Sequence, residues 1–485
     1  MTAPNTFAEP LWSAPELALA TAGRLVGRPD GALTGVSIDS RTVGRGEVFF
    51  AIKGDIHDGH RFVGDALGRG ASLAVVDERH ADEASAFGPI LIVKDVLEAL
   101  VATGVAARAR SRAKIVAVTG SVGKTSTKEA LRLALGEDGQ THASAASHNN
   151  HWGVPLTLSR LPKSALYGVF EIGMNHPDEI RPLVKMVRPH VAMVTNVEPV
   201  HLAAFKNVEG IADAKAEIFE GLVRGGHAVI NRDNAHYERL KAAAIECGAA
   251  VWSFGEHVSA DARLDRLALK ETSSCVAATI LGEAMTFKIG APGRHVVQNA
   301  LGVLLAAKLA GADLALAGLA LAKFTPPAGR GQRHELAIHG GSVLVIDESY
   351  NANPASMRSA LALLGQTMAP PTGRRIAALG DMLELGEEGP ALHAKVAEAV
   401  AAARIDLVFC AGPLMKSLFD ALPKARRGAW AETAAELQPK LLDRLKTGDV
   451  VMVKGSNGSR MGPIVAAMKE RFRPLSAVDE TQAAG

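Results

Sequence analysis

Cysteine is scarce in this sequence, and neither sign of charge dominates it. The three cysteines, Cys247, Cys275 and Cys410, are odd in number and far apart, which argues against a disulfide framework and a cysteine-based zinc site. The 53 basic and 51 acidic residues leave a net charge of +2, so no overall field favours nucleic acid or a membrane surface. We therefore expect a cytoplasmic protein with reduced thiols and no nucleic-acid partner, and we take it to be a monomer.

Uninterrupted apolar runs of membrane-spanning length are absent as well. The most apolar region, residues 300–324, is broken by Lys308 and Asp313, and it predicts two buried helices that meet near Gly311. The first sixteen residues contain two glutamates and no basic residue, which is not the pattern of a secretory signal peptide. We expect no membrane span, and the 48% hydrophobic content is sufficient for sizeable cores.

Alternating strand and helix signals divide the 485 residues into three α/β segments, the number that about 150 residues per domain predicts. Residues 1–112 form a small α/β unit. Residues 113–328 have the doubly wound pattern of a parallel sheet, and residues 329–485, after a predicted hinge at 326–329, resemble a dinucleotide-binding fold. The predicted strands are 36–42, 47–52, 73–76, 90–93, 115–118, 167–172, 191–196, 227–231, 342–346, 375–379, 407–410 and 450–453.

The most informative motif is a glycine-rich loop between the predicted strand 115–118 and a helical segment. Gly120 and Gly123 allow a tight turn whose backbone N–H groups point at phosphate oxygens, and the helix adds its positive end. Lys124 can reach the β- and γ-phosphates, and the Thr125 hydroxyl is placed for Mg²⁺. The alternative is a glycine-rich turn with an exposed lysine. The predicted nucleotide-binding residues here are Gly120, Ser121, Val122, Gly123, Lys124, Thr125 and Ser126.

Polar side chains that follow the next two strands are candidate Mg²⁺ ligands. Ligands of open α/β sheets bind at the carboxyl ends of the strands, and carboxylate oxygens suit Mg²⁺. Glu171 ends one strand, and His201 lies five residues beyond the end of the following one. A solvated loop glutamate and a structural histidine are the alternatives.

Three further residues allow two interpretations each. Lys215 lies beside the apolar stripe of a helix, where burial would lower its pKa and permit chemical modification, unless its ammonium group extends to solvent. Asn299 enters an apolar helix, where it is either a helix N-cap or a buried amide. Arg330 follows the hinge, where it either swings onto a γ-phosphate or is solvated.

Two loops that follow strands of the third segment are rich in hydrogen-bonding groups. Residues 347–354 contain two acids, two asparagines and a proline, and such loops bind a ligand or cap the next helix. Residues 454–460 offer backbone N–H groups and two cations for an anionic group, with a flexible solvated turn as the alternative.

The order of these pieces along nearly the whole chain resembles the Mur ligase family of ATP-dependent, amide-bond-forming enzymes. Within the family, four motifs are similar to the branch that adds D-alanyl-D-alanine to UDP-N-acetylmuramoyl-tripeptide, and the Asp-Asn-Pro-Arg loop of the diaminopimelate-adding branch is missing. The resemblance implies ATP, this tripeptide and this dipeptide as substrates, two Mg²⁺ ions, and an acyl-phosphate intermediate in cytoplasmic peptidoglycan precursor synthesis. The four motifs are 149–157, 347–354, 379–386 and 453–456.

The resemblance also implies roles for the segments and for individual residues. Residues 1–112 would bind the UDP-sugar, residues 113–328 would bind ATP, and residues 329–485 would close on ATP and bind the dipeptide. Mg²⁺ would be held by Thr125, Glu171 and His201, and Asn299 and Asp347 would contact the nucleotide. The implied catalytic residues are Lys124, Glu171, His201, a carbamylated Lys215 and Arg330. The implied substrate contacts are Ser40, Arg41, Lys53 and Gly54 for uridine diphosphate, with Asn149, Asn150, Tyr350, Asn351, Asn353 and Lys454 as further contacts.

Three alternatives remain beside this interpretation. They are a sister ligase that adds diaminopimelate, a folylpolyglutamate synthase, and a nucleotide-dependent switch. Residues 40–41 and 53–54 speak against the folate enzyme, which lacks such a UDP-binding domain. A switch would not require both a UDP-muramoyl peptide and an amine for phosphate release. The chain departs from the usual family pattern at Glu198, Val200 and Glu348, which leaves the role of the second acid in the 347–348 pair open.

Overall fold

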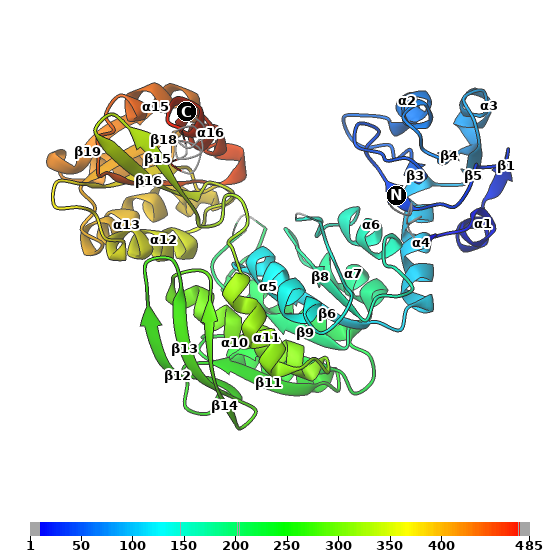
Figure 1. Ribbon diagram of the computed structural model, residues 1–485, viewed down its shortest axis with the longest axis horizontal. Coiled ribbons are helices and arrows are strands. Elements are labelled where there is room, and N and C mark those ends of the chain that lie inside the picture. Colours follow the sequence, from blue (N-terminus) through cyan, green and yellow to red (C-terminus); the bar gives the residue numbers. More distant parts are fainter. Residues whose placement is uncertain (1–9, 146, 201, 203, 474, 476–485) are drawn as a thin grey trace, which may run out of the picture.

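Three β-sheets, arranged in sequence along the chain, organise the computed structural model (Figure 1). The structure describes residues 10–145, 147–200, 202, 204–473 and 475. In Figure 1 the N-terminal part and the C-terminal part lie on opposite sides above the central part. The α/β fold class with three sheet-containing parts is confirmed.

The N-terminal part has a five-stranded sheet in the order β1-β5-β4-β3-β2, parallel except for the edge strand β1. Its strands are β1 (Arg24–Val26), β2 (Gly35–Ser37), β3 (Glu47–Phe50), β4 (Leu73–Asp77) and β5 (Ile90–Val93). Its helices are α1 (Ala14–Thr21), η1 (Gly59–Phe62), α2 (Val63–Gly68), η2 (Glu78–His80), α3 (Ala81–Ser85) and α4 (Val96–Arg110).

The central part has a nine-stranded sheet in the order β14-β13-β12-β11-β10-β9-β6-β8-β7, in which only the β12–β13–β14 meander is antiparallel. Its strands are β6 (Lys114–Thr119), β7 (Thr141–Ala143), β8 (Tyr167–Glu171), β9 (Val191–Val194), β10 (His227–Asn231), β11 (Ala250–Gly255), β12 (Ala262–Leu269), β13 (Ser274–Ile280) and β14 (Glu283–Ile289). Its helices are α5 (Lys124–Gly136), α6 (Gly153–Ser159), α7 (Ile180–Val187), α8 (Val208–Ala216), η3 (Glu217–Gly221), α9 (Tyr237–Glu246), α10 (Arg294–Leu309), α11 (Leu314–Ala320) and η4 (Leu321–Lys323).

Helices cover both faces of the central sheet, which explains why its inner strands are apolar throughout. Helices α5, α10 and α11 share one core with Val116 and Val118 of β6 (Figure 1). Helices α6 to α9 form the opposite core with Ile115 and Ala117 of the same strand. These four residues, 115–118 of β6, are fully buried, as expected for a parallel strand with helices on both sides.

The C-terminal part has a six-stranded sheet in the order β15-β16-β20-β17-β18-β19, parallel except for the edge strand β15. Its strands are β15 (Gln332–Ile338), β16 (Gly341–Glu348), β17 (Arg375–Gly380), β18 (Leu407–Ala411), β19 (Arg427–Ala431) and β20 (Val450–Lys454). Its helices are α12 (Pro354–Gln366), η5 (Gly386–Glu388), α13 (Gly389–Ala402), α14 (Met415–Ala421), η6 (Lys424–Arg426), α15 (Ala434–Leu442), η7 (Asn457–Ser459) and α16 (Gly462–Arg471).

The N-terminal and central parts are joined by side chains that cross between them. The Trp12 indole N–H donates to the Ser159 carbonyl oxygen at 2.9 Å. Arg160 Nε donates to the Val36 carbonyl oxygen at 2.6 Å. These contacts fix the first sheet relative to the second.

Most predicted strands are confirmed, and the differences have local causes. The strand predicted at 36–42 ends at Ser37, because the backbone N–H and guanidinium of Arg41 both donate to the Asp39 carboxylate and close a turn. The sequence pattern did not predict β15 or β19, the two edge strands of the third sheet. Edge strands are only partly covered by other elements, so their apolar signal is weaker than that of the inner strands.

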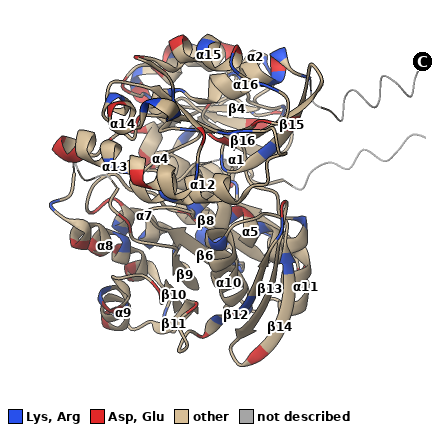
Figure 2. Ribbon diagram, turned by 90° about the vertical axis from the view of Figure 1, so that its left-hand side faces the viewer, with Lys and Arg blue, Asp and Glu red and all other residues tan. Residues whose placement is uncertain are grey.

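The apolar region 300–324 is confirmed as parts of two helices, α10 and α11, which are separated by Gly311 with φ +94°. In the described part of the chain, no helix combines the length and the apolar character that a bilayer crossing requires. Basic and acidic residues both appear on outer helices such as α8, α9 and α15 in Figure 2, in keeping with the net charge of +2.

Candidate active site

The glycine-rich loop connects β6 to α5, and its two glycines are required by close approach of neighbouring groups. Gly120 has φ +149°, and a Cβ there would lie 2.0 Å from Thr195 Oγ1. Gly123 has φ +85°, and a Cβ there would lie 2.6 Å from Asn299 Nδ2. Thr195 Oγ1 also donates to the Val122 carbonyl oxygen at 2.6 Å. The end of β9 therefore holds the loop in the tight turn that phosphate binding needs.

A cavity of about 370 Å³ lies beside this loop, between the central part and the C-terminal part. It brings together most of the residues that the sequence predicted for nucleotide, metal and substrate binding. These residues are spread over more than 300 positions of the chain, from Ser121 to Lys454. Those that line it are Ser121, Val122, Gly123, Lys124, Thr125, Ser126, Asn149, Glu171, Asn299, Arg330, Tyr350, Asn351, Asn353 and Lys454.

Lys124 is the cation at the centre of the loop. Its Nζ donates to the Gly120 carbonyl oxygen at 2.7 Å, so the ammonium group is directed back over the loop. Burial lowers the pKa of Lys124, the Glu171 carboxylate acts to raise it, and Arg330 acts to lower it further. An anion from the central part, Glu171, and a cation from the C-terminal part, Arg330, therefore both act on the Lys124 ammonium group.

Glu171, at the end of β8, has one satisfied and one free carboxylate oxygen. Oε1 accepts hydrogen bonds from Asn149 Nδ2 at 2.7 Å and from Thr125 Oγ1 at 3.2 Å. Oε2 is buried and has no hydrogen-bond partner. A buried carboxylate oxygen without a donor is costly unless a cation completes the site. Together with the Thr125 hydroxyl, this oxygen fits Mg²⁺, which prefers hard oxygen ligands.

Lys215, near the end of α8, is a buried lysine with only 2% of its surface exposed. Burial, and then the positive charge of Lys124, lower the pKa of Lys215 well below its usual value. Among the hydrogen bonds and ion pairs of the described residues, none involves its Nζ. A buried amine with a lowered pKa beside a cation fits carbamylation, because the reaction with CO₂ needs the free base and the carbamate product is an anion.

The C-terminal part contributes a second set of charged and aromatic groups. The Arg330 guanidinium lies 4.2 Å from the centre of the Tyr350 ring, which holds it at the mouth of the cavity. Lys454 Nζ donates to the Asn351 carbonyl oxygen at 2.9 Å and pairs with Glu348 at 3.3 Å. The loop that precedes α12 is therefore tied to the end of β20.

Some predicted residues lie away from this cavity. The Asp347 carboxylate accepts hydrogen bonds from the backbone N–H and the hydroxyl of Ser349 within its own loop, and it does not line the cavity. Side chains alternate along a strand, so it is Glu348, the neighbouring residue, that faces the cavity. Asn150 Oδ1 accepts from the Gly153 N–H and caps α6. His201 lies outside the described residues.

The structure excludes one of the two interpretations of Asn299 that the sequence allowed. The helix it enters begins at Arg294, with Gly293 as its N-cap, so the interpretation of Asn299 as a helix cap is wrong. The residue lies in the second turn of α10, where its amide meets Gly123 and lines the cavity.

The residues predicted for uridine diphosphate lie in the N-terminal part, apart from the cavity at the glycine-rich loop. Arg41 is paired with Asp39 and its side chain is 84% exposed, and this hydrogen-bonded pair lowers the pKa of Asp39 to about 2. Lys53 is exposed, and Gly54 lies against the Trp152 ring of the central part. Ser40 is half-buried beside Arg41. These residues share one end of the first sheet.

A second, larger cavity of about 980 Å³ adjoins the first and is lined by cations that the sequence pattern did not reveal, two of them on helices of the C-terminal part. Arg358 of α12 and Lys395 of α13 line it, and both are exposed. Neither takes part in an ion pair or hydrogen bond found among the described residues. Asn196, Asn231 and Gln298 line both cavities, so the two lie next to each other. On the sequence alone, both cations are indistinguishable from solvated helix residues.

Comparisons with known proteins agree with this arrangement. Three family models match the chain: the Mur ligase family catalytic domain at residues 32–119, the Mur ligase middle domain at 118–307, and the Mur ligase glutamate ligase domain at 329–457. The UDP-N-acetylmuramoyl-tripeptide–D-alanyl-D-alanine ligase of Escherichia coli is 35% identical over 445 residues, which cover 91% of this chain and 95% of that protein.

Solved structures are similar over the whole chain. A structure of MurF from Acinetobacter baumannii has a TM-score of 0.82 at 29% identity and covers 95% of this chain and 99% of its own. MurF ligase from Thermotoga maritima in complex with ADP has a TM-score of 0.74 at 25% identity, with coverages of 90% and 97%. The sequence motifs, the three sheets and these matches agree, and the chain belongs to the Mur ligase family.

Proposed function

We propose that this protein is an ADP-forming ligase that uses ATP to join D-alanyl-D-alanine to UDP-N-acetylmuramoyl-tripeptide in the cytoplasm. The observation that carries the proposal is the cavity in which the phosphate loop with Lys124 faces Arg330 and Lys454 of the C-terminal part. Relatives that cover nine-tenths of the chain are named for this reaction. Residues 1–112 hold the UDP-sugar, 113–328 hold ATP, and 329–485 hold the dipeptide.

ATP is bound by the loop and by an adjacent apolar pocket. The backbone N–H groups of the loop and Lys124 hold the phosphates, at the positive end of α5. Asn299 and Arg330 line both the phosphate cavity and a small neighbouring cavity of about 60 Å³, whose other lining residues include Val296 and Phe324. An aliphatic and aromatic pocket beside an amide suits the adenine base, because it covers the ring faces and offers the ring edge a hydrogen bond.

Mg²⁺ is held by Thr125 and by the free oxygen of Glu171, with His201 as a further ligand. When bound, the two ions withdraw negative charge from the phosphoryl group that is transferred. Lys215 in its carbamylated form supplies an anion that orients the second ion and is balanced by Lys124. We also propose that the protein is a monomer.

The chemistry follows from the weak electrophilicity of a carboxylate. An oxygen of the tripeptide's terminal carboxylate attacks the γ-phosphorus, and ADP leaves, with Lys124 and Arg330 stabilising the charge. The dipeptide amine then attacks the acyl carbon, phosphate leaves, and the amine nitrogen loses its proton. Because acyl phosphates hydrolyse, the C-terminal part must close over the cavity before the first step.

The second cavity is the place for the acceptor dipeptide. D-alanyl-D-alanine carries an amine that must reach the acyl phosphate in the first cavity and a carboxylate that needs a cation. The two cavities share three lining residues, and Arg358 and Lys395 are cations in the second that have no ion pair among the described residues. This orientation directs the amine toward Lys124 and the carboxylate toward Arg358 and Lys395.

Replacing Arg358 with alanine should raise KM for D-alanyl-D-alanine about tenfold, the effect of losing one charge-assisted hydrogen bond of about 1.4 kcal/mol. KM for ATP should change less than twofold, because Arg358 does not line the phosphate cavity. Steady-state kinetics with each substrate varied in turn measures both constants. Arg266→Ala, at an exposed position of β12, is the matched control. An unchanged KM for the dipeptide in Arg358→Ala would remove Arg358 from the acceptor site.

Replacing Glu171 with glutamine should raise the Mg²⁺ concentration for half-maximal rate about 10- to 100-fold, because the substitution keeps the shape and removes the charge. A titration of ligation rate against Mg²⁺ measures the effect. Glu238→Gln, at a position that is 71% exposed, should behave like the unmodified protein. If the Mg²⁺ dependence of Glu171→Gln is also unchanged, the metal is held elsewhere.

The acyl-phosphate step has a direct isotopic test. The tripeptide's terminal carboxylate is labelled with oxygen-18, and the released phosphate is analysed by mass spectrometry. Transfer of one labelled oxygen to inorganic phosphate is expected, because the carboxylate oxygen that attacks ATP leaves with the phosphate. Phosphate without label, at a normal rate of amide formation, would contradict the mechanism.

A further inference from the structure

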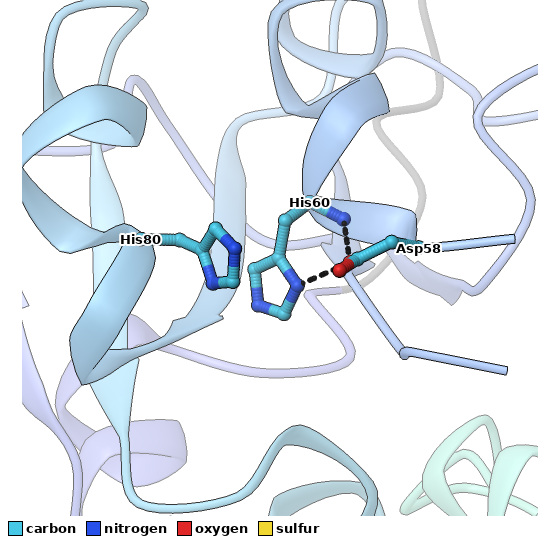
Figure 3. Close-up of side chains that lie close together, drawn as sticks. All are labelled: Asp58, His60 and His80. Atoms are coloured by element: carbon cyan, nitrogen blue, oxygen red, sulfur yellow. Dashed lines mark hydrogen bonds and ion pairs between the residues drawn. The ribbon is translucent and has the colours of Figure 1, made fainter.

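A second cluster of metal-ligating side chains lies in the N-terminal part, far along the chain from the phosphate loop. Asp58, His60 and His80 each offer one ligand atom, and these atoms all lie within 4.8 Å of one another (Figure 3). Asp58 immediately precedes η1, His60 lies within it, and His80 is the last residue of η2. The fold thus brings together three ligands from two neighbouring short helices.

The hydrogen bonds of the cluster define which nitrogen atoms are available. His60 Nε2 accepts a hydrogen bond from the Asp77 backbone N–H at 3.2 Å, so the proton of a neutral His60 ring is on Nδ1, which faces Asp58 Oδ1 at 2.7 Å. His80 Nδ1 donates to Asp77 Oδ1 at 2.7 Å. In the described structure no hydrogen bond reaches His80 Nε2, which is therefore free to accept a cation.

This pattern is the one that orients histidine ligands in metal sites. A metal-binding histidine almost always donates its other ring N–H to a carboxylate or carbonyl, which fixes the tautomer and raises the basicity of the ligating nitrogen. Asp77 performs this role for His80, and it is itself held by the backbone N–H groups of Arg79 and His80. On His60, a metal ion would replace the single proton that lies between Nδ1 and Asp58.

There is space for an ion and its water ligands. A cavity of about 270 Å³ is lined by His60, His80 and Glu83 and opens beside the cluster. The His60 side chain is 4% exposed, whereas that of His80 is 34% exposed. The two rings stack with centroids 3.9 Å apart and planes at 15°. The lone pairs of their ring nitrogens therefore lie in nearly parallel planes and do not converge on one point. To share an ion with His60, His80 must therefore turn about its side-chain bonds and give up the hydrogen bond to Asp77 that holds it in the present rotamer; its exposed position permits this turn.

We propose that Asp58, His60 and His80 form a binding site for a divalent transition-metal ion of the Zn²⁺ type, completed by water from the cavity. Two imidazoles and one carboxylate favour Zn²⁺ over Mg²⁺, which prefers oxygen ligands only. The site is distinct from the Mg²⁺ site at Glu171. Asp58 also pairs through its backbone with Lys53, so the ion would tie down the loop that carries Lys53 and Gly54.

The test uses the full-length protein without a histidine tag, stripped with a chelator and kept in Mg²⁺ buffer. Isothermal titration with Zn²⁺ alone should show one equivalent bound, and His80→Gln should weaken this binding at least about tenfold. His57→Gln is the matched control, because His57 is exposed on the same loop and lies outside the cluster. Asp58→Asn provides a second variant that keeps the side-chain shape, and circular dichroism verifies folding of each.

Cobalt gives an independent measurement of the ligands. Co²⁺ bound by two imidazoles and a carboxylate should give visible absorption bands that are lost in His80→Gln and Asp58→Asn and retained in His57→Gln. Failure of the unmodified protein to bind Zn²⁺ would overturn the proposal. Zn²⁺ binding that persists unchanged in His80→Gln and Asp58→Asn, as expected for a site at the exposed Cys247, would overturn it equally.

Discussion

Substitution of Lys124 by methionine should lower kcat for ATP-dependent ligation by about 10³-fold, the effect of removing one preorganised group that stabilises transition-state charge. Lys124 lines the phosphate cavity and is the only basic residue of the loop 119–125, so no other cation of the loop replaces it. Burial already lowers the pKa of Lys124, which means that its ammonium group is held at a cost to folding. The methionine variant should therefore melt at or above the temperature of the unmodified protein.

The two readouts for Lys124→Met separate a catalytic role from a structural one. Ligation rates and thermal unfolding are measured on the same preparation, with Lys163→Met as the matched control at a position that is 51% exposed. A large loss of kcat without a loss of melting temperature is the expected pair. A variant that keeps its ligation rate would show that the loop does not hold the reacting phosphates.

Substitution of Lys215 by alanine should lower the ligation rate about 10²-fold or more, because an ion displaced by the loss of the carbamate leaves the reacting atoms out of alignment. Lys215 is buried, and burial together with Lys124 lowers its pKa, which favours the free base that takes up CO₂. Lys215→Arg should be equally impaired, since arginine stays cationic and forms no carbamate.

Chemical rescue distinguishes the carbamate from a packing role. Acetate or another short carboxylate should restore part of the activity of Lys215→Ala, because it returns an anion to the vacated space, and it should not restore Lys215→Arg. Lys241→Ala, at a position that is 41% exposed, serves as the control. Full activity of Lys215→Arg, or absence of any response to carboxylates in Lys215→Ala, would contradict carbamylation.

The glycine-rich loop could be predicted from the sequence because its constraints are local. Gly120 and Gly123 are needed for positive φ within a few residues of the lysine that they position, and the flanking strand and helix have clear apolar patterns. Glu171 could be proposed from its place at the end of a strand. Its hydrogen bond from Asn149 could not be predicted, because it joins a loop to the end of β8, and their approach depends on the pairing of β7 with β8.

Other features depend on how whole parts of the molecule meet. Arg358 and Lys395 have the sequence signature of exposed helix residues, and only the approach of the C-terminal part to the central part places them in a cavity. Asp347 was expected at the nucleotide, whereas strand alternation turns Glu348 toward the cavity and leaves Asp347 to its own loop. His60 and His80 are twenty residues apart, and their contact follows from the folding of η1 against the end of β4.

The central claim is that phosphate release from ATP is coupled to formation of one specific amide bond. The most direct measurement is phosphate release with UDP-N-acetylmuramoyl-tripeptide, with and without D-alanyl-D-alanine, together with the product mass. We predict release only when both are present, with a mass gain equal to the dipeptide less one water. Release without the dipeptide, or amide formation with free diaminopimelate in its place, would contradict the account and indicate a switch or a sister ligase.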